Sequence, residues 1–134
     1  MLDLSVFDWS EYTILIADDD DGNYTLLWYM LNDVKSSVIR ASNGFEAVET
    51  CKSNKNINLV LMDVKMPVMD GIEATRAIKS FRTDLPIIMQ SAHIIEDVKL
   101  NCFDAGCDEF LVKPFDEDLF YPLINSYLKK RNEP

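Results

Sequence analysis

Five short, mostly apolar runs are spaced along the chain, and amphipathic segments separate them. The runs lie at 13–17, 37–41, 58–63, 85–91 and 109–112. They are rich in Val, Ile and Leu and too short to be helices, so each is predicted to be a buried strand. The segments between them carry apolar residues at helical spacing. After the first run, for example, these residues are Leu27, Met30, Leu31 and Val34.

The predicted helices begin near Asn23 and then occupy 43–52, 70–81, about 94–105 and 116–130. Asn43 with Glu46 three residues later is typical of a capped helix start, and Gly106 of a helix end. Apolar strands that alternate with helices predict a parallel sheet covered on both faces. The predicted fold class is therefore α/β, a doubly wound three-layer sandwich that binds ligands at the carboxyl ends of its strands.

Four of the five runs end in, or are followed directly by, an acid, a hydroxyl or a lysine that could belong to a site. These side chains are Asp18 and Asp19 after the first run, Asp63 in the third, Ser91 in the fourth and Lys113 after the fifth. The carboxyl ends of parallel strands share one rim, so the side chains are expected to cluster there. Clustered carboxylates repel one another, and Mg²⁺ held by one or two carboxylates and several waters would relieve this repulsion. A carboxylate beside Mg²⁺ and a lysine is suited to attack a phosphoryl group.

Composition and charge narrow the function further. The chain has 134 residues, which fits one domain, and a net charge of −10, which argues against direct binding of nucleic acid. The opening residues MLDLSVFDWSEY have neither the basic segment nor the apolar core of a signal peptide, and no apolar stretch is long enough for a membrane span. The three cysteines are odd in number and form no CxxC pair. They are expected to be buried thiols in a reduced compartment, which favours a cytoplasmic protein.

From about residue 12 to 130, the chain resembles the receiver domains of two-component response regulators. The resemblance rests on ILIADDDD, LVLMDVKMPVMDG, PIIMQSA and DEFLVKPF, in this order and at family spacing. It implies a flavodoxin-like (βα)5 sandwich with strand order 2-1-3-4-5. It also implies a receiver domain over 12–131, preceded by an N-terminal extension or junction remnant over 1–11. The implied function is that of a phosphoacceptor signalling domain rather than a turnover enzyme. It would take a phosphoryl group from a phosphohistidine and change conformation.

The resemblance also implies roles for individual residues. Asp63 would accept the phosphoryl group. The implied Mg²⁺ ligands are the side chains of Asp18, Asp19 and Asp63 and the backbone carbonyl of Lys65. The phosphoryl oxygens would be bound by Lys113 and Ser91. The Lys113–Pro114 bond is expected to be cis, as in the family, and X-Pro bonds adopt this form at low cost.

A further set of residues would transmit the signal or set its lifetime. Ser91 and Phe110 would form the switch pair, although the commonest residues there in the family are Thr and Tyr. Because Phe110 has no hydroxyl, its signal must come from packing. Lys65 and His93 would border the path of the attacking water and tune the rate of dephosphorylation.

Several other kinds of site fit the sequence less well. A haloacid dehalogenase-type phosphatase needs an acid two residues after the nucleophile, where this chain has Lys65, and 134 residues leave no room for a cap domain. The four glycines form neither GxxxxGK[ST] nor GxGxxG. The Asp run fails as a calcium loop because Ala17 and Trp28 occupy ligand positions. His93 is the only histidine and has no cysteine or histidine at zinc-ligand spacing.

The partners that the resemblance implies are a histidine kinase or a histidine phosphotransfer domain, and a dimer that forms on phosphorylation is a further option. Two origins of the chain stay open: a stand-alone regulator or a receiver from a hybrid histidine kinase. The stretch MDVKMPVMDGIEATRAI is similar to receivers of hybrid kinases and favours the second origin.

Overall fold

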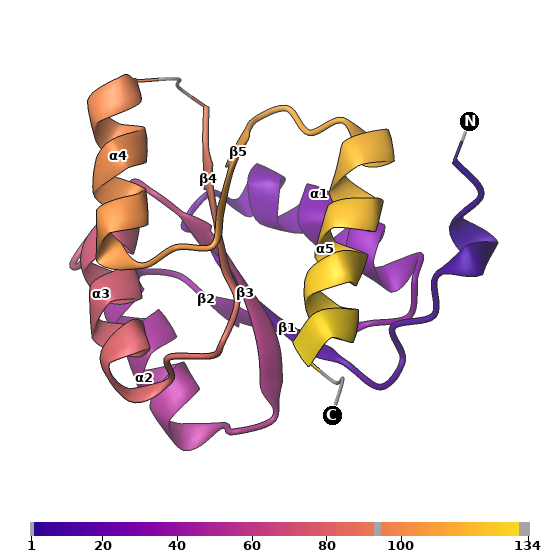
Figure 1. Cartoon of the computed structure of the whole chain (residues 1–134), viewed down its shortest axis with the longest axis horizontal. Helices are drawn as coiled ribbons and strands as arrows, with labels where there is room; N and C mark the ends of the chain where they lie inside the picture. The colour runs from indigo at the N-terminus through magenta and orange to yellow at the C-terminus, as the bar shows by residue number, and fades with distance from the viewer. Residues whose placement is uncertain (1, 93–94, 132–134) are drawn as a thin grey trace.

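Five parallel strands form a single sheet at the centre of the molecule (Figure 1). The computed structural model describes residues 2–92 and 95–131. The strands are β1 (Thr13–Ala17), β2 (Ser37–Ala41), β3 (Ile57–Asp63), β4 (Ile87–Ser91) and β5 (Glu109–Val112). Their order in the sheet is β2-β1-β3-β4-β5, and each neighbouring pair is parallel. The predicted fold class and strand order are confirmed.

Helices cover both faces of this sheet. They are α1 (Asp21–Asn32), α2 (Gly44–Ser53), α3 (Gly71–Phe81), α4 (Glu96–Ala105) and α5 (Glu117–Arg131), with a short 3-10 helix at Leu4–Val6. Helices α1 and α5 lie on one face, and α2, α3 and α4 lie on the other (Figure 1). No helix among the described residues is long and apolar enough to cross a membrane.

A helix cap and a proline explain where two elements depart from their predicted bounds. Helix α1 begins at Asp21 rather than near Asn23, because the Asp20 carboxylate accepts a hydrogen bond from the Asn23 backbone N–H and caps the helix. Strand β4 begins at Ile87 rather than at residue 85, since Pro86 has no N–H with which to join a ladder. Asn43 and Gly106 cap helices as predicted.

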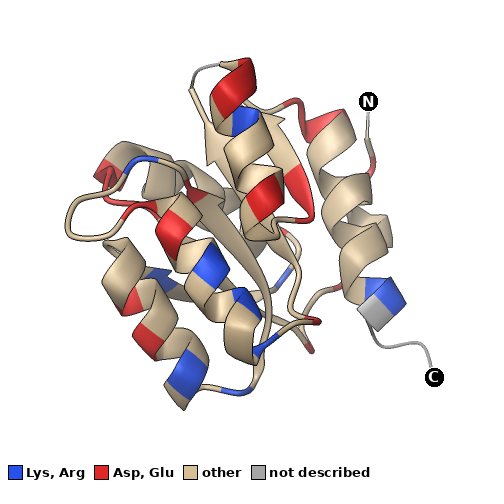
Figure 2. Cartoon of the chain, turned by 60° about the vertical axis from the view of Figure 1, so that its left-hand side comes forward, with Lys and Arg blue, Asp and Glu red and all other residues tan. Residues whose placement is uncertain are grey.

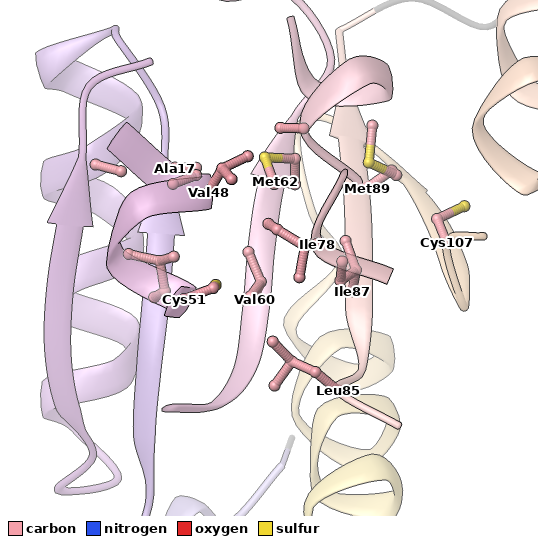
Figure 3. Close-up of a cluster of buried hydrophobic side chains, with 14 of the residues drawn as sticks. Ala17, Val48, Cys51, Val60, Met62, Ile78, Leu85, Ile87, Met89 and Cys107 are labelled. Carbon is pink, nitrogen blue, oxygen red and sulfur yellow. The ribbon is translucent and has the colours of Figure 1, made fainter. Parts of the chain in front are cut away.

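Each face of the sheet has its own apolar core. On the side of α2, α3 and α4, side chains of β3 and β4 such as Val60, Met62 and Ile87 point toward Val48 and Ile78 (Figure 3). The second core lies under α1 and α5 and includes the predicted α1 residues Leu27, Met30, Leu31 and Val34. All three cysteines are buried, as predicted.

The segment before β1 also joins the second core. Trp9 is fully buried, and its indole Nε1–H donates to Asn125 Oδ1 on α5 at 3.0 Å. Its backbone N–H donates to the Val34 carbonyl at 2.8 Å, just beyond α1. The segment therefore connects the C-terminal end of α1 to the middle of α5, while its assignment as an extension outside the receiver domain stays a prediction.

Candidate functional site

The acidic loop between β1 and α1 is held by a hydrogen bond within the loop and by contacts with Arg40 of β2. The buried Asp18 carboxylate accepts the backbone N–H of Asp20 at 2.9 Å, while Asp19 is exposed. From β2, the Arg40 guanidinium donates to the Asp18 carbonyl at 3.2 and 3.3 Å and pairs with the Asp21 carboxylate at 2.8 Å. These contacts hold the loop at the carboxyl end of β1 although it carries consecutive acids.

Asp63 is the last residue of β3, and the start of α3 packs closely against its backbone. A Cβ atom at Gly71 would lie 2.0 Å from the Asp63 carbonyl oxygen, so no larger residue fits there without a shift. The Gly71 N–H also donates to the Val64 carbonyl at 2.8 Å. The Asp-Gly pair of the MDG motif therefore allows the helix to begin directly against the strand that carries Asp63.

The acids meet a single ammonium at this rim. Lys113 Nζ lies 3.2 Å from Asp18 Oδ2 and 3.1 Å from Asp63 Oδ1. One oxygen each from Asp18, Asp19 and Asp63 lies within 4.8 Å of the others. Burial raises the pKa of Asp63 to about 6, with Asp18 and Asp19 also raising it and Lys113 opposing the rise. The cluster thus carries more negative charge than its lysine balances.

This donor set fits a hard divalent cation. Three carboxylates against one ammonium leave two negative charges, and carboxylate oxygens are the ligands that Mg²⁺ takes in proteins. Asp19 is exposed and Asp63 partly so, which leaves room for the waters that Mg²⁺ usually retains. The residues present are therefore compatible with Mg²⁺.

A hollow of about 190 Å³ opens beside the acids. It is lined by Asn23, Asp63, Lys65, Ser91, Ala92 and Lys113. Ser91, at the end of β4, is largely buried, and its carbonyl accepts the Lys113 backbone N–H at 2.8 Å. An acid, two ammonium groups and a hydroxyl around one hollow make it suited to a phosphoryl group.

The structure brings together most of the residues predicted for the site. Asp18, Asp19, Asp63, Lys65, Ser91 and Lys113 lie at the rim. Phe110 does not line the hollow and instead packs, partly buried, against the core under α2, α3 and α4. The Lys113–Pro114 bond is cis. His93 lies outside the described residues.

Two residues near the acids were not predicted from the sequence. Arg40 had a weak signal, since it is a lone charge in an otherwise apolar run. Asn23 had none, because a polar residue in the first turn of a helix is ordinary. Both reach the site only because β1 lies beside β2 and α1 begins at the rim.

Comparison with known proteins shows which family this chain belongs to. The family model of the response regulator receiver domain matches residues 14–125. The chain is 35% identical over 105 residues to the transcriptional regulatory protein ZraR of Klebsiella oxytoca, which covers 78% of this chain and 24% of that protein. It is 35% identical over 109 residues to the sensor protein GacS of Pseudomonas syringae pv. syringae, which covers 78% of this chain and 12% of that protein. The chain thus spans a quarter or less of the length of these relatives.

A solved structure shares the architecture. It is the receiver domain of the sensor histidine kinase PA1611 from Pseudomonas aeruginosa PAO1, with a TM-score of 0.82 and 28% identity. The match covers 88% of this chain and 98% of that one. That structure has a magnesium ion coordinated in its active site cleft.

Proposed function

Because this chain belongs to the response regulator receiver domain family, we propose that Asp63 is the residue that accepts its phosphoryl group. Receiver domains act in two-component systems, and acceptance of a phosphoryl group with Mg²⁺ is the standard role of the family. One observation carries the assignment to Asp63: its carboxylate shares Lys113 with Asp18 beside a hollow that is also lined by Lys65 and Ser91.

In the proposed transfer, a carboxylate oxygen of Asp63 attacks the phosphorus of a phosphohistidine. A P–O bond forms, the P–N bond breaks, and the electron pair of that bond leaves with the imidazole. The Lys113 ammonium lies 3.1 Å from Asp63 and neutralises charge on the transferring oxygens, while the Ser91 hydroxyl donates to one of them. Asp18, Asp19, Asp63 and the Lys65 carbonyl would hold Mg²⁺, which supplies further positive charge at those oxygens when bound.

The proposed switch joins Ser91 to Phe110. A phosphoryl group brings about −1.5 to −2 charges and new acceptor oxygens, so it draws the Ser91 hydroxyl toward Asp63. The space that Ser91 vacates can be filled by the Phe110 ring, which is only partly buried. Phe110 also lines a hollow of about 290 Å³ between β5 and α5. Without a hydroxyl, the ring stabilises its new position by packing alone.

Two side chains are proposed to set the lifetime of the phosphorylated state. Lys65 is exposed and lines the hollow beside Asp63, where water must enter to hydrolyse the acyl phosphate. His93 follows Ser91 by two residues in the sequence and has the same proposed role.

The proposed partners follow from the proposed chemistry. The phosphoryl group would come from a histidine kinase or a histidine phosphotransfer domain in the cytoplasm, and the phosphorylated chain is proposed to signal or dimerise rather than to act as a turnover enzyme. Since GacS is a sensor protein of which this chain covers a small part, a receiver from a hybrid histidine kinase is the favoured origin.

Phosphorylation with a small donor tests the assignment. Acetyl phosphate with Mg²⁺ should add one acid-stable, base-labile phosphoryl group per chain, measured by intact-protein mass. Asp63→Ala should remain unlabelled. The matched control is Asp104→Ala, an exposed acid in the last turn of α4 and so at the opposite end of the sheet, which should label like the parent. Full labelling of Asp63→Ala would refute the assignment.

A further inference from the structure

Asn23 lies on the phosphoryl hollow, yet neither the sequence motifs nor the proposed mechanism gives it a role. It belongs to the first turn of α1, directly after β1. It lines the 190 Å³ hollow and also a smaller neighbouring one of about 110 Å³, and Lys113 is the other residue common to both. In the sheet, β3 lies between β1 and β4. Asn23, which follows β1, and Ser91, at the end of β4, therefore approach Asp63 from opposite sides.

The chemistry of Asn23 differs from that of the rest of the lining. The other lining residues supply one acid, two ammonium groups, one hydroxyl and a methyl group. Asn23 alone offers a carboxamide, with two N–H donors and one acceptor oxygen. Its backbone N–H donates a hydrogen bond to Asp20 Oδ2 at 2.8 Å. Within the described part of the chain its side chain makes no hydrogen bond. Its donors are therefore free to bind a ligand in the hollow.

A role in stabilising the helix does not account for this side chain. Asp20 already caps α1, so Asn23 is not the capping residue. Asn is also a poorer helix former than Ala, so a purely structural view expects Asn23→Ala to leave the protein as stable or more stable.

We propose that Asn23 is a phosphoryl-contact residue: its carboxamide N–H donates to an oxygen of the phosphoryl group on Asp63 from the α1 side. This inference rests on the proposed function of Asp63. Lys113, just after β5, and Ser91, at the end of β4, donate from one side, so Asn23 completes the set of donors on the β1 side. Loss of this donor weakens the hold on a phosphoryl group without changing the metal ligands.

Beryllofluoride, a mimic of the phosphoryl group, allows phosphoryl binding to be measured separately from Mg²⁺ binding. With saturating Mg²⁺, Asn23→Ala should bind beryllofluoride about tenfold more weakly than the parent, the effect of one hydrogen bond to a charged group. Its affinity for Mg²⁺ alone should stay within about twofold of the parent, because the carboxylates are unchanged. Amide resonances in titrations of the whole chain give both affinities. Asn32→Ala, the same substitution at the exposed far end of α1, is the control and should match the parent.

A second variant keeps the shape of the side chain and removes its donors. Asn23→Asp should lose at least as much beryllofluoride affinity as Asn23→Ala, because it also adds a negative charge beside the phosphoryl mimic. Parent-like beryllofluoride affinity in either variant would overturn the inference, and so would an equal loss of Mg²⁺ affinity in Asn23→Ala. A parent chain that binds Mg²⁺ but neither beryllofluoride nor a phosphoryl group would instead overturn the proposed function itself.

Discussion

At the amino end of the sheet, Arg82 and Asp108 each have several partners, whereas the acids at the carboxyl end compete for one lysine. Arg82 donates to four backbone carbonyls, those of Cys51, Asn54, Lys55 and Ile57, at 2.7 to 3.4 Å. Asp108 Oδ2 accepts Lys79 Nζ and the Ile87 N–H, both at 2.9 Å. The difference indicates that the amino end of the sheet stabilises the fold. The carboxyl end has too few positive charges for its acids, and a bound cation can supply them.

The helices reinforce this difference between the two ends. Helices α2 and α3 each have an acid in the first turn, Glu46 and Glu73, and a lysine in the last turn, Lys52 and Lys79. Figure 2 shows the basic residues of these helices toward their C-terminal ends. This arrangement complements the helix dipole. In a parallel sheet the helices start at the carboxyl ends of the strands, so it also adds acids at the site end and bases at the other.

The largest expected effect on stability lies at the amino end. Trp9→Ala should lower the free energy of unfolding by about 3–5 kcal/mol, because it leaves a cavity in the core and Asn125 without its donor. Urea denaturation measures this loss. Trp28→Ala is the matched control, since Trp28 is 37% exposed, and should cost far less. Equal losses would contradict the role of Trp9 as a core residue and would favour a loosely attached N-terminal segment.

The next effect concerns Arg82. Arg82→Ala should cost about 2–4 kcal/mol, less than the sum of its hydrogen bonds, because water can reach some of the freed carbonyls. The control is Arg76→Ala on α3, the helix that Arg82 follows; the Arg76 side chain is 57% exposed and its Nη1 lies 3.9 Å from Asp104 Oδ2. Such a surface pair contributes about 0–1 kcal/mol. If the two variants unfold at the same urea concentration, Arg82 does not anchor this end.

The smallest expected effect is a gain in stability rather than a loss, and it lies at the carboxyl end of the sheet. In EDTA at pH 7, Asp63→Asn should raise the free energy of unfolding by about 1–2 kcal/mol, because an ionised Asp63 is repelled by Asp18 and Asp19 and is partly buried. This figure is below the full value of the shift, since solvent screens part of the interaction. Asp104→Asn, at the opposite end of the sheet in the last turn of α4, should change the free energy of unfolding little.

The pH dependence of this gain follows from the raised pKa. The folded state holds the Asp63 proton up to about pH 6, whereas the unfolded state loses it near pH 4. The parent therefore loses stability as the pH rises through 6, and the advantage of Asp63→Asn should shrink as the pH falls below 6. Saturating Mg²⁺ should also reduce the advantage, because it stabilises the parent more than the variant. A destabilised Asp63→Asn in EDTA at pH 7 would show that the Lys113 pair outweighs the repulsion.

Local pattern was sufficient to predict the fold class and the acidic rim, whereas the order of the strands came from the family resemblance. Apolar runs alternating with helical segments determine a parallel sheet, and the parallel arrangement brings the residues after each strand to one edge. Asp18, Asp19, Asp63, Ser91 and Lys113 could therefore be placed together without coordinates. The caps at Asn43 and Gly106 were equally predictable, since their hydrogen bonds join residues a few positions apart.

The tertiary structure alone decided the contacts between distant segments. Trp9 binds Asn125, 116 residues away, although the apolar segment around it could equally have belonged to a junction. Arg82 reaches the carbonyls that it binds, and Asn23 reaches the hollow beside Asp63, only after α3 and α1 have packed on the sheet. A residue type and its neighbours in sequence determine periodicity and capping. Which polar groups meet across the fold depends on how whole elements pack, and that depends on every side chain in the core at once.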